Sequence, residues 1–291
     1  LGGALAPLSA GELASAVLTG LLQRSGIPGS RVDDVILGQC YPTMEAPPIG
    51  RVAALDAGLP VSVGGYQLDR RCGSGLQAVV NAAMQVQTGV SEVVIAGGVE
   101  SMSNAPHYTE EGRRGVPSRG LVLYDALSRG RERAGGRRHP LPDGNIGSAE
   151  VLRREYRISR ARQDAYALQS HQRAVSAQGE GAFDREVLPV EVAGKHGSVV
   201  VTRDEHPRGD TSLDALGALR PALLRKDPQA TVTAGNSSGQ NDAAAACIVT
   251  TPEAAADLGL VPMLRLVSWA TAGVEPERFG MGPVPATRRA L

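Results

Sequence analysis

The sequence has few aromatic residues, no excess of charge of either sign and no long apolar run, and each shortage excludes a class of function. Aromatic residues make up 3% of the 291 residues, so platforms that stack nucleic-acid bases are not expected. Thirty basic residues balance thirty acidic ones, which argues against non-specific nucleic-acid binding but leaves room for a local basic patch that binds a phosphorylated ligand. No apolar run reaches the roughly 18 residues of a membrane span, and no signal peptide is visible.

Cysteine is also scarce. The three cysteines, Cys40, Cys72 and Cys247, are odd in number, far apart and without a CxxC pair. This pattern excludes a disulfide framework and a zinc site, and we expect no metal. It fits a reducing, cytoplasmic setting.

The residues around Cys72 carry the strongest local signal. Cys72 lies between a strand-like run, residues 62–68, and a run with helical periodicity whose apolar positions are Leu76, Val79, Val80, Ala83 and Met84. Gly89 is a natural end for this helix. A thiol at a helix N-terminus faces backbone N–H groups and the positive end of the helix dipole, which favours the nucleophilic thiolate. The alternative interpretation of Cys72 is a small buried apolar residue, as most free cysteines are.

Apolar residues make up 42% of the chain, and its length fits two domains or one core with a large insertion. Short apolar strands are expected at 35–38 and 93–96. Helices are expected from the Ser9–Glu12 capping box to Gly26 and over 52–59. This alternation predicts an α/β fold with a parallel or mixed sheet and helices on its faces.

The composition of the sequence changes after residue 100. Residues 101–145 are rich in Arg, Gly, Pro and His with little periodicity, which indicates a surface excursion. Its arginine cluster is interpreted as a solvated face, and its members are Arg129, Arg131, Arg133, Arg137 and Arg138. Two helices over 149–156 and 160–178 and two strand-like runs over 186–192 and 198–202 follow.

From Thr231 on, the sequence again alternates between short strand-like and helical segments, as expected for a core. We expect a turn of small residues at 233–239, a helix over 241–245, a strand over 247–250, a helix over 252–258, a strand over 264–270 and the first turns of a helix over 285–291. A helix interrupted in its first turns, and a first residue other than Met, predict that the chain is truncated at both ends.

Several segments, in order along the whole chain, resemble the thiolase family, the acetyl-CoA C-acyltransferases. They are 35–38, 71–76 around Cys72, 96–103 (Ala-Gly-Gly-Val-Glu-Ser-Met-Ser), 231–242 and 267–286. The resemblance implies a layered α-β-α-β-α core made of two similar halves, with a loop domain inserted in the first. The predicted domains are 1–100 with 231–262 for the first half, 101–230 for the loop domain and 263–291 for the start of the second half.

The resemblance also implies the chemistry. Cys72 would accept an acyl group from coenzyme A as a thioester, and the deprotonated α-carbon of a second acyl-CoA would attack it to form 3-ketoacyl-CoA. The reverse reaction would cleave 3-ketoacyl-CoA with coenzyme A. Bases and oxyanion donors are needed, and the backbone N–H of Cys72 is one expected donor. Coenzyme A thioesters are substrates, and no cofactor is expected.

The sequence departs from the family in its catalytic set. Thiolases also use an Asn in an Asn-Glu-Ala-Phe-like motif, a His in Gly-His-Pro and a second Cys in a Gly-rich segment, and none of these motifs occurs here. None of the five histidines matches the catalytic one; they are His107, His139, His171, His196 and His206. Cys40 and Cys247 are interpreted as structural, and Cys247 as part of the core.

Five residues match coenzyme A contacts of the family. Ser238 and Ala234 match positions along the pantetheine arm, Arg208 a position near the nucleotide, and Phe279 a residue lining the channel. Asn145 stands where many members have His or Met near the acyl group. Each has an ordinary alternative as a turn, surface or core residue.

Two other interpretations stay open. One is another condensing enzyme of this fold, such as a ketoacyl synthase. The other is a catalytically incomplete module that binds acyl-CoA or only oligomerises. As in thiolases, a homodimer or homotetramer is expected, without nucleic-acid or membrane partners.

Overall fold

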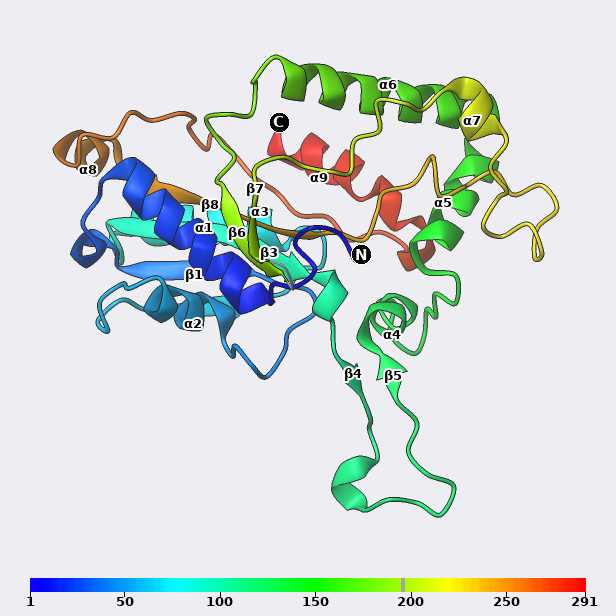
Figure 1. Cartoon of the computed structure of the whole chain (residues 1–291), viewed down its shortest axis with the longest axis horizontal. Coiled ribbons are helices and arrows are strands. Elements are labelled where there is room, and N and C mark those ends of the chain that lie inside the picture. The colour runs from blue at the N-terminus through cyan, green and yellow to red at the C-terminus, as the bar shows by residue number, and fades with distance from the viewer. Residues whose placement is uncertain (195–196) are drawn as a thin grey trace. The chain divides into compact units, whose positions relative to one another are not determined.

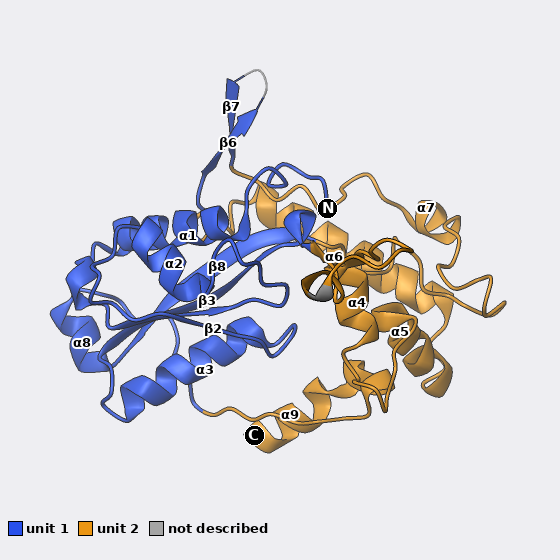
Figure 2. Ribbon diagram, turned by 90° about the horizontal axis from the view of Figure 1, so that it is seen from below, with its two compact units in different colours: residues 1–106, 188–201, 241–267 blue, residues 107–187, 202–240, 268–291 orange. Residues whose placement is uncertain are grey.

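The computed structural model describes residues 1–194 and 197–291; Lys195 and His196, and with them the prediction for His196, lie outside the described residues. The chain forms two compact units, shown in different colours in Figure 2. Unit 1 comprises residues 1–106, 188–201 and 241–267, and unit 2 comprises 107–187, 202–240 and 268–291.

Unit 1 contains a four-stranded sheet with the order β2-β1-β3-β8 (Figure 1). The three strands that come first in the chain are parallel, and β8 runs antiparallel to β3. The mixed sheet predicted from the sequence is therefore confirmed. The strands are β1 (Asp34–Gly38), β2 (Tyr66–Leu68), β3 (Val93–Ser101) and β8 (Asp242–Thr250).

Helices cover both faces of this sheet. Helices α1 (Ala10–Ser25) and α2 (Ile49–Asp56) pack on one face, and α3 (Ser74–Gln87) packs on the other, as Figure 2 shows. Alternation along β1 divides the core: Val35 and Leu37 face α1 and α2, whereas Ile36 faces α3. All three side chains are fully buried, as expected for a parallel strand between two helical layers.

The predicted capping box begins α1. The Ser9 hydroxyl accepts a hydrogen bond from the backbone N–H of Glu12 at 3.2 Å, and the Glu12 carboxylate accepts one from the backbone N–H of Ser9 at 2.7 Å. Gly26 ends the helix in the left-handed conformation. Both helix ends are thus set by local sequence.

The prediction that Leu76 begins the buried face of α3 is wrong. Leu76 is 69% exposed, whereas the stripe on the sheet consists of Ala78, Ala82 and Val86. Small residues bring the helix axis close to β1 and β3, so the contact is made by alanines rather than by the larger leucine.

The helix predicted over 241–245 is also wrong. These residues begin β8, where Ala243–Ala246 pair with Gly97–Glu100 of β3. An added Cβ on Gly97 would lie 2.8 Å from the Cα of Ala246, so the two backbones approach closely. Pairing with a distant strand therefore overrides the helical preference of the alanines.

The strand predicted over 264–270 is absent, and residues 260–275 have no regular secondary structure. Leu264 is 93% exposed and Val267 is 78% exposed. Apolar composition alone predicted a strand here, but no described strand pairs with the segment, and a strand requires a partner.

Unit 2 is mainly helical. Its hairpin strands β4 (His107–Tyr108) and β5 (Tyr124–Asp125) and its helix α4 lie in the stretch predicted as an irregular excursion. Asp125 caps α4 through the N–H groups of Leu127 and Ser128. The helices are α4 (Ala126–Glu132), α5 (Gly144–Glu155), α6 (Arg160–Gly179), α7 (Leu213–Gly217) and α9 (Pro283–Ala290), with the 3₁₀ helix η4 (Pro276–Met281).

The arginine cluster of this unit is mostly solvated, as predicted. Arg133, Arg137 and Arg138 are exposed. Arg129 differs, because its guanidinium lies over the Tyr124 ring at 4.5 Å from the centroid.

The domain boundaries stay a prediction, but the compact units divide the chain differently. The hairpin β6 (Val190–Gly194) and β7 (Gly197–Val201) belongs to unit 1, where Leu188 packs against Gly20 of α1. Residues 231–240 belong to unit 2 instead of the core. The remaining short elements are α8 (Pro252–Asp257) and 3₁₀ turns at Gly29–Arg31, Met102–Asn104 and Gly112–Arg114.

None of the helices in the described part of the chain combines the length and apolar content needed to cross a membrane.

Candidate active site

Cys72 lies in the turn between β2 and α3, two residues before the helix begins at Ser74. Its side chain is exposed. Strands β1, β2 and β3 are parallel, so their carboxyl ends share one edge of the sheet, and this turn leaves that edge from β2. The prediction of a thiol at a strand–turn–helix junction is confirmed in position, and such edges are where α/β proteins bind ligands.

Ser74 closes the turn that carries Cys72. Its hydroxyl accepts a hydrogen bond from the backbone N–H of Arg70 at 2.8 Å and donates one to the carbonyl of Arg71 at 2.6 Å. The side chain is buried, with 3% exposed. An added Cβ on Gly38 would lie 2.6 Å from the Cβ of Ser74, so only glycine lets the turn rest on the end of β1.

Arg71 has an unusual backbone and several partners. Its φ of 49° is left-handed, which is uncommon for a residue other than glycine. Its guanidinium donates a hydrogen bond to the carbonyl of Cys40 at 2.9 Å and lies over the Tyr41 ring at 4.9 Å from the centroid. Its backbone N–H donates to Asp69 at 2.6 Å. The strained residue before Cys72 is thus held from three sides, and Cys72 has a defined position.

Backbone donors at the start of α3 are free. Cys72 itself forms an isolated β-bridge with Arg70 across the turn. Helix α3 has no side-chain cap, and within residues 1–194 and 197–291 the N–H groups of Gly75 and Leu76 have no partner. These donors can stabilise negative charge on the sulfur or on an attached oxygen.

Cys40, beside this turn, is not equipped as a nucleophile. Burial raises the pKa of the Cys40 thiol to about 11, and the negative charge of Glu100 adds to the effect. The Glu100 carboxylate accepts hydrogen bonds from the N–H groups of Cys40 and Tyr41 at 2.8 and 3.1 Å. Burial also raises the pKa of Glu100, against these hydrogen bonds. The acidic end of β3 thus orders the segment after β1 and keeps Cys40 protonated.

Cys247 was expected in the core, and this is wrong. It is exposed on β8, on the same face as Ala243 and Ala245, which are also exposed. The opposite face of β8 packs through Ala244, Ala246 and Ile248 against the core under α1. Since β8 is an edge strand, helix α3 does not cover the whole of its other face.

All five residues matched to coenzyme A contacts lie in unit 2, whereas Cys72 lies in unit 1. Ala234 and Ser238 share one loop, Asn145 is in the first turn of α5, Arg208 is in the segment before α7, and Phe279 is in η4. All five are exposed. Helices α5 and η4 contact each other, and their ion pair joins Arg278 and Glu155 at 2.8 Å.

A buried carboxylate holds the start of the loop that carries Ala234 and Ser238. Glu150 of α5 is 1% exposed and accepts hydrogen bonds from the N–H groups of Thr231 and Val232 at 2.7 and 2.8 Å. Its other oxygen pairs with Arg153 at 2.8 Å, and Arg153 also pairs with Asp227 at 2.9 Å. The buried charge is therefore compensated by both a cation and backbone donors.

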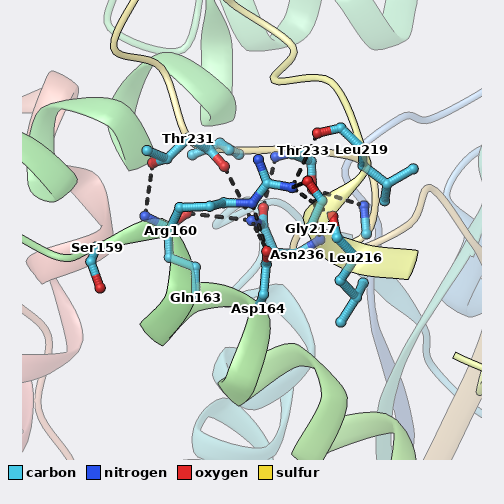
Figure 3. Close-up of polar contacts among 12 residues, drawn as sticks. Ser159, Arg160, Gln163, Asp164, Leu216, Gly217, Leu219, Thr231, Thr233 and Asn236 are labelled. Atoms are coloured by element: carbon cyan, nitrogen blue, oxygen red, sulfur yellow. Dashed lines mark hydrogen bonds and ion pairs between the residues drawn. The ribbon is translucent and has the colours of Figure 1, made fainter. Parts of the chain in front are cut away.

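A second buried carboxylate holds the middle of the loop (Figure 3). Asp164 of α6 is 4% exposed; it accepts a hydrogen bond from the Asn236 side chain at 2.9 Å and pairs with Arg160 at 2.7 Å. The Asn236 oxygen accepts from the N–H of Thr233 at 2.7 Å. Arg160 in turn donates to the carbonyls of Leu216 and Leu219. The loop is thus tied to α6 and to the segment around α7.

Sequence analysis missed these anchoring residues. Glu150 and Asp164 lie in the helices predicted over 149–156 and 160–178, but neither was singled out. The available signal was spacing: Arg153 follows Glu150 by three residues, and Arg160 precedes Asp164 by four, which are helical pairing distances. Spacing alone does not distinguish a buried pair from a surface pair.

The model of the thiolase N-terminal domain matches residues 1–253. The chain belongs to the thiolase family. An acetyl-CoA acetyltransferase of Rhizobium meliloti (strain 1021) is 41% identical to it over 99% of this chain and 72% of that relative. The beta-ketothiolase BktB of Cupriavidus necator is 40% identical over 100% of this chain and 72% of its own length.

The solved structures agree with this assignment. The crystal structure of the Bacillus anthracis acetyl-CoA acetyltransferase matches with a TM-score of 0.93 and 41% identity, over 100% of this chain and 72% of that one. The thiolase fold implied by the sequence motifs is therefore confirmed.

Proposed function

We propose that the protein is an acyl-CoA C-acyltransferase that forms or cleaves 3-ketoacyl-CoA, with Cys72 as the acyl acceptor. Membership of the thiolase family gives the class of reaction. The observation that supports the role of Cys72 is its exposed side chain at the N-terminus of α3, in a turn whose backbone is fixed by Ser74 and Arg71.

In the first half-reaction, the Cys72 thiolate attacks the carbonyl carbon of an acyl-CoA. The bond from that carbon to the coenzyme A sulfur breaks, coenzyme A leaves as its thiolate and takes up a proton, and the acyl group stays on Cys72 as a thioester. Free N–H groups at the start of α3 stabilise the negative oxygen of the tetrahedral intermediate.

In the second half-reaction, a second acyl-CoA loses a proton from its α-carbon. This carbon attacks the Cys72 thioester, the bond to the Cys72 sulfur breaks, and 3-ketoacyl-CoA and the Cys72 thiolate result. In the family the bases for these proton transfers come from motifs that do not occur in these 291 residues.

Coenzyme A binding is assigned by resemblance to residues of unit 2. Ser238 and Ala234 contact the pantetheine arm, Phe279 lines its channel, Asn145 lies near the acyl group and Arg208 binds near the nucleotide. The support is that the Ala234–Ser238 loop is held by two buried carboxylates, so it is pre-organised for a ligand. The substrates are coenzyme A thioesters without a separate cofactor. We also propose that the protein forms a homodimer or homotetramer in the cytoplasm.

The test is the mass of the intact protein after incubation with acetyl-CoA, followed by peptide mapping. A single acetyl adduct on Cys72, lost in Cys72→Ser, is expected. The matched control is Cys247→Ser, which replaces the other exposed cysteine and should acylate like the wild type. An unmodified Cys72, or an adduct that persists in Cys72→Ser, contradicts the proposal.

A further inference from the structure

In unit 2, the segment of residues 203–209 lies along the second half of α6. The Gln178 side chain donates to the carbonyl of Asp204 at 3.0 Å and accepts from the Arg203 guanidinium at 3.3 Å. An added Cβ on Gly209 would lie 3.5 Å from Val175. The contacts fall at positions 171, 175 and 178, which share one face of a helix.

His171 makes the contact closest to Arg208. The backbone N–H of Arg208 donates a hydrogen bond to Nδ1 of His171 at 3.1 Å. Nδ1 of an imidazole accepts a hydrogen bond when its proton is on Nε2, so this contact uses the Nε2–H tautomer.

The Arg208 side chain is exposed and forms no ion pair with any residue that the structure describes. The Arg208 backbone is fixed by its hydrogen bond to His171, and its guanidinium is unpaired among the described residues. Such a guanidinium can bind a phosphate through two parallel hydrogen bonds. Freeing the backbone would add conformations that must be lost on binding.

We propose that His171 is a positioning residue for Arg208: its ring tethers the segment so that Arg208 meets the phosphates of the coenzyme A nucleotide. This inference rests on the proposed role of Arg208. The loss of one hydrogen bond weakens coenzyme A binding by about three- to tenfold.

The His206 ring of the tethered segment is stacked on the His171 ring, with centroids 6.3 Å apart. This contact is a second attachment of the segment to α6, beside the hydrogen bond to Nδ1.

The test compares the wild type with His171→Asn and His171→Leu. The Asn side chain offers an oxygen near the place of Nδ1. The Leu side chain offers no acceptor. His139→Asn is the matched control, because His139 is an exposed histidine of the same unit.

The measurement is the dissociation constant of coenzyme A at pH 8 by calorimetry. The wild type and His171→Asn should bind alike, because the Asn oxygen replaces the acceptor. His171→Leu should bind about three- to tenfold more weakly. Pantetheine, which lacks the nucleotide, should show no such difference.

Equal binding of coenzyme A by the wild type and His171→Leu overturns the inference. If no variant binds coenzyme A, the proposed role of Arg208 fails, and hydrogen exchange of residues 203–209 still tests the tether. Exchange of this segment should be faster in His171→Leu than in the wild type and in His171→Asn. Equal exchange in the three proteins contradicts the tether itself.

Discussion

The hydroxyl of Ser74 donates a hydrogen bond to the carbonyl of Arg71, at 2.6 Å, across the turn that carries Cys72. The same oxygen accepts from the N–H of Arg70. One buried serine therefore fixes the backbone on the N-terminal side of the thiol, and it does so without touching the thiol.

Replacing Ser74 with alanine should slow acylation of Cys72. The change leaves a buried N–H without its partner, which costs about 1–3 kcal/mol, and frees the turn. We expect the acetyl-transfer rate, followed by intact mass, to fall by about tenfold or more. Ser15→Ala is the control, because its hydroxyl bonds only within α1. An unchanged rate in Ser74→Ala would show that the turn keeps its shape without the serine.

Cys40 and Cys72 should differ in reactivity toward iodoacetamide. With a pKa of about 11, roughly one Cys40 thiol in a thousand is ionised at pH 8, and its alkylation rate should rise about tenfold per pH unit up to pH 10. The exposed Cys72 should be alkylated first. Peptide mapping over time measures both sites.

Glu100→Gln should speed the alkylation of Cys40. Removing the carboxylate charge removes one of the causes that raise the pKa of the Cys40 thiol, so more thiolate forms at a given pH. We expect about a threefold to tenfold increase at pH 8, with burial still opposing ionisation. An unchanged rate would mean that the charge of Glu100 does not affect the sulfur.

Glu150→Gln should destabilise unit 2 and weaken coenzyme A binding. The amide retains the size of the side chain but loses the charge that two backbone N–H groups and Arg153 require. Breaking such a buried pair costs about 3 kcal/mol, measurable by urea denaturation. Glu155→Gln, which breaks the surface pair with Arg278, should cost about 0.5 kcal/mol or less. Equal effects in the two variants would contradict the difference in burial.

Gly97→Ala should destabilise the sheet of unit 1. The new methyl group would meet the backbone of β8 at Ala245 and Ala246, which cannot move without breaking the β3–β8 ladder. We expect a loss of about 2 kcal/mol. Gly179→Ala is the control, because nothing lies within 4 Å of an added Cβ at the end of α6. A neutral Gly97→Ala would show that β8 shifts freely along β3.

Prediction from sequence succeeded where the signal is local. The capping box at Ser9 and the helix after Cys72 depend on residues within a few positions of each other, and the structure has both. It failed at 241–245, where alanines pair with residues 98–100 of β3 across the sheet, and at Leu76, where the small residues of α3 face the sheet. Helical periodicity identified α3 but did not select its buried face.

The sequence by itself determined the family, the position of Cys72 between a strand and a helix, and the alternation of an α/β sheet, because these follow from motifs and periodicity in contiguous residues. Only the tertiary structure decided that Cys247 is exposed, that Ser74 holds the turn that carries Cys72, and that Glu150 and Asp164 are buried anchors of the Ala234–Ser238 loop. The reason is physical: burial and hydrogen-bond partners depend on which distant segments come together, and charge spacing along a helix is the same whether the pair faces water or a loop.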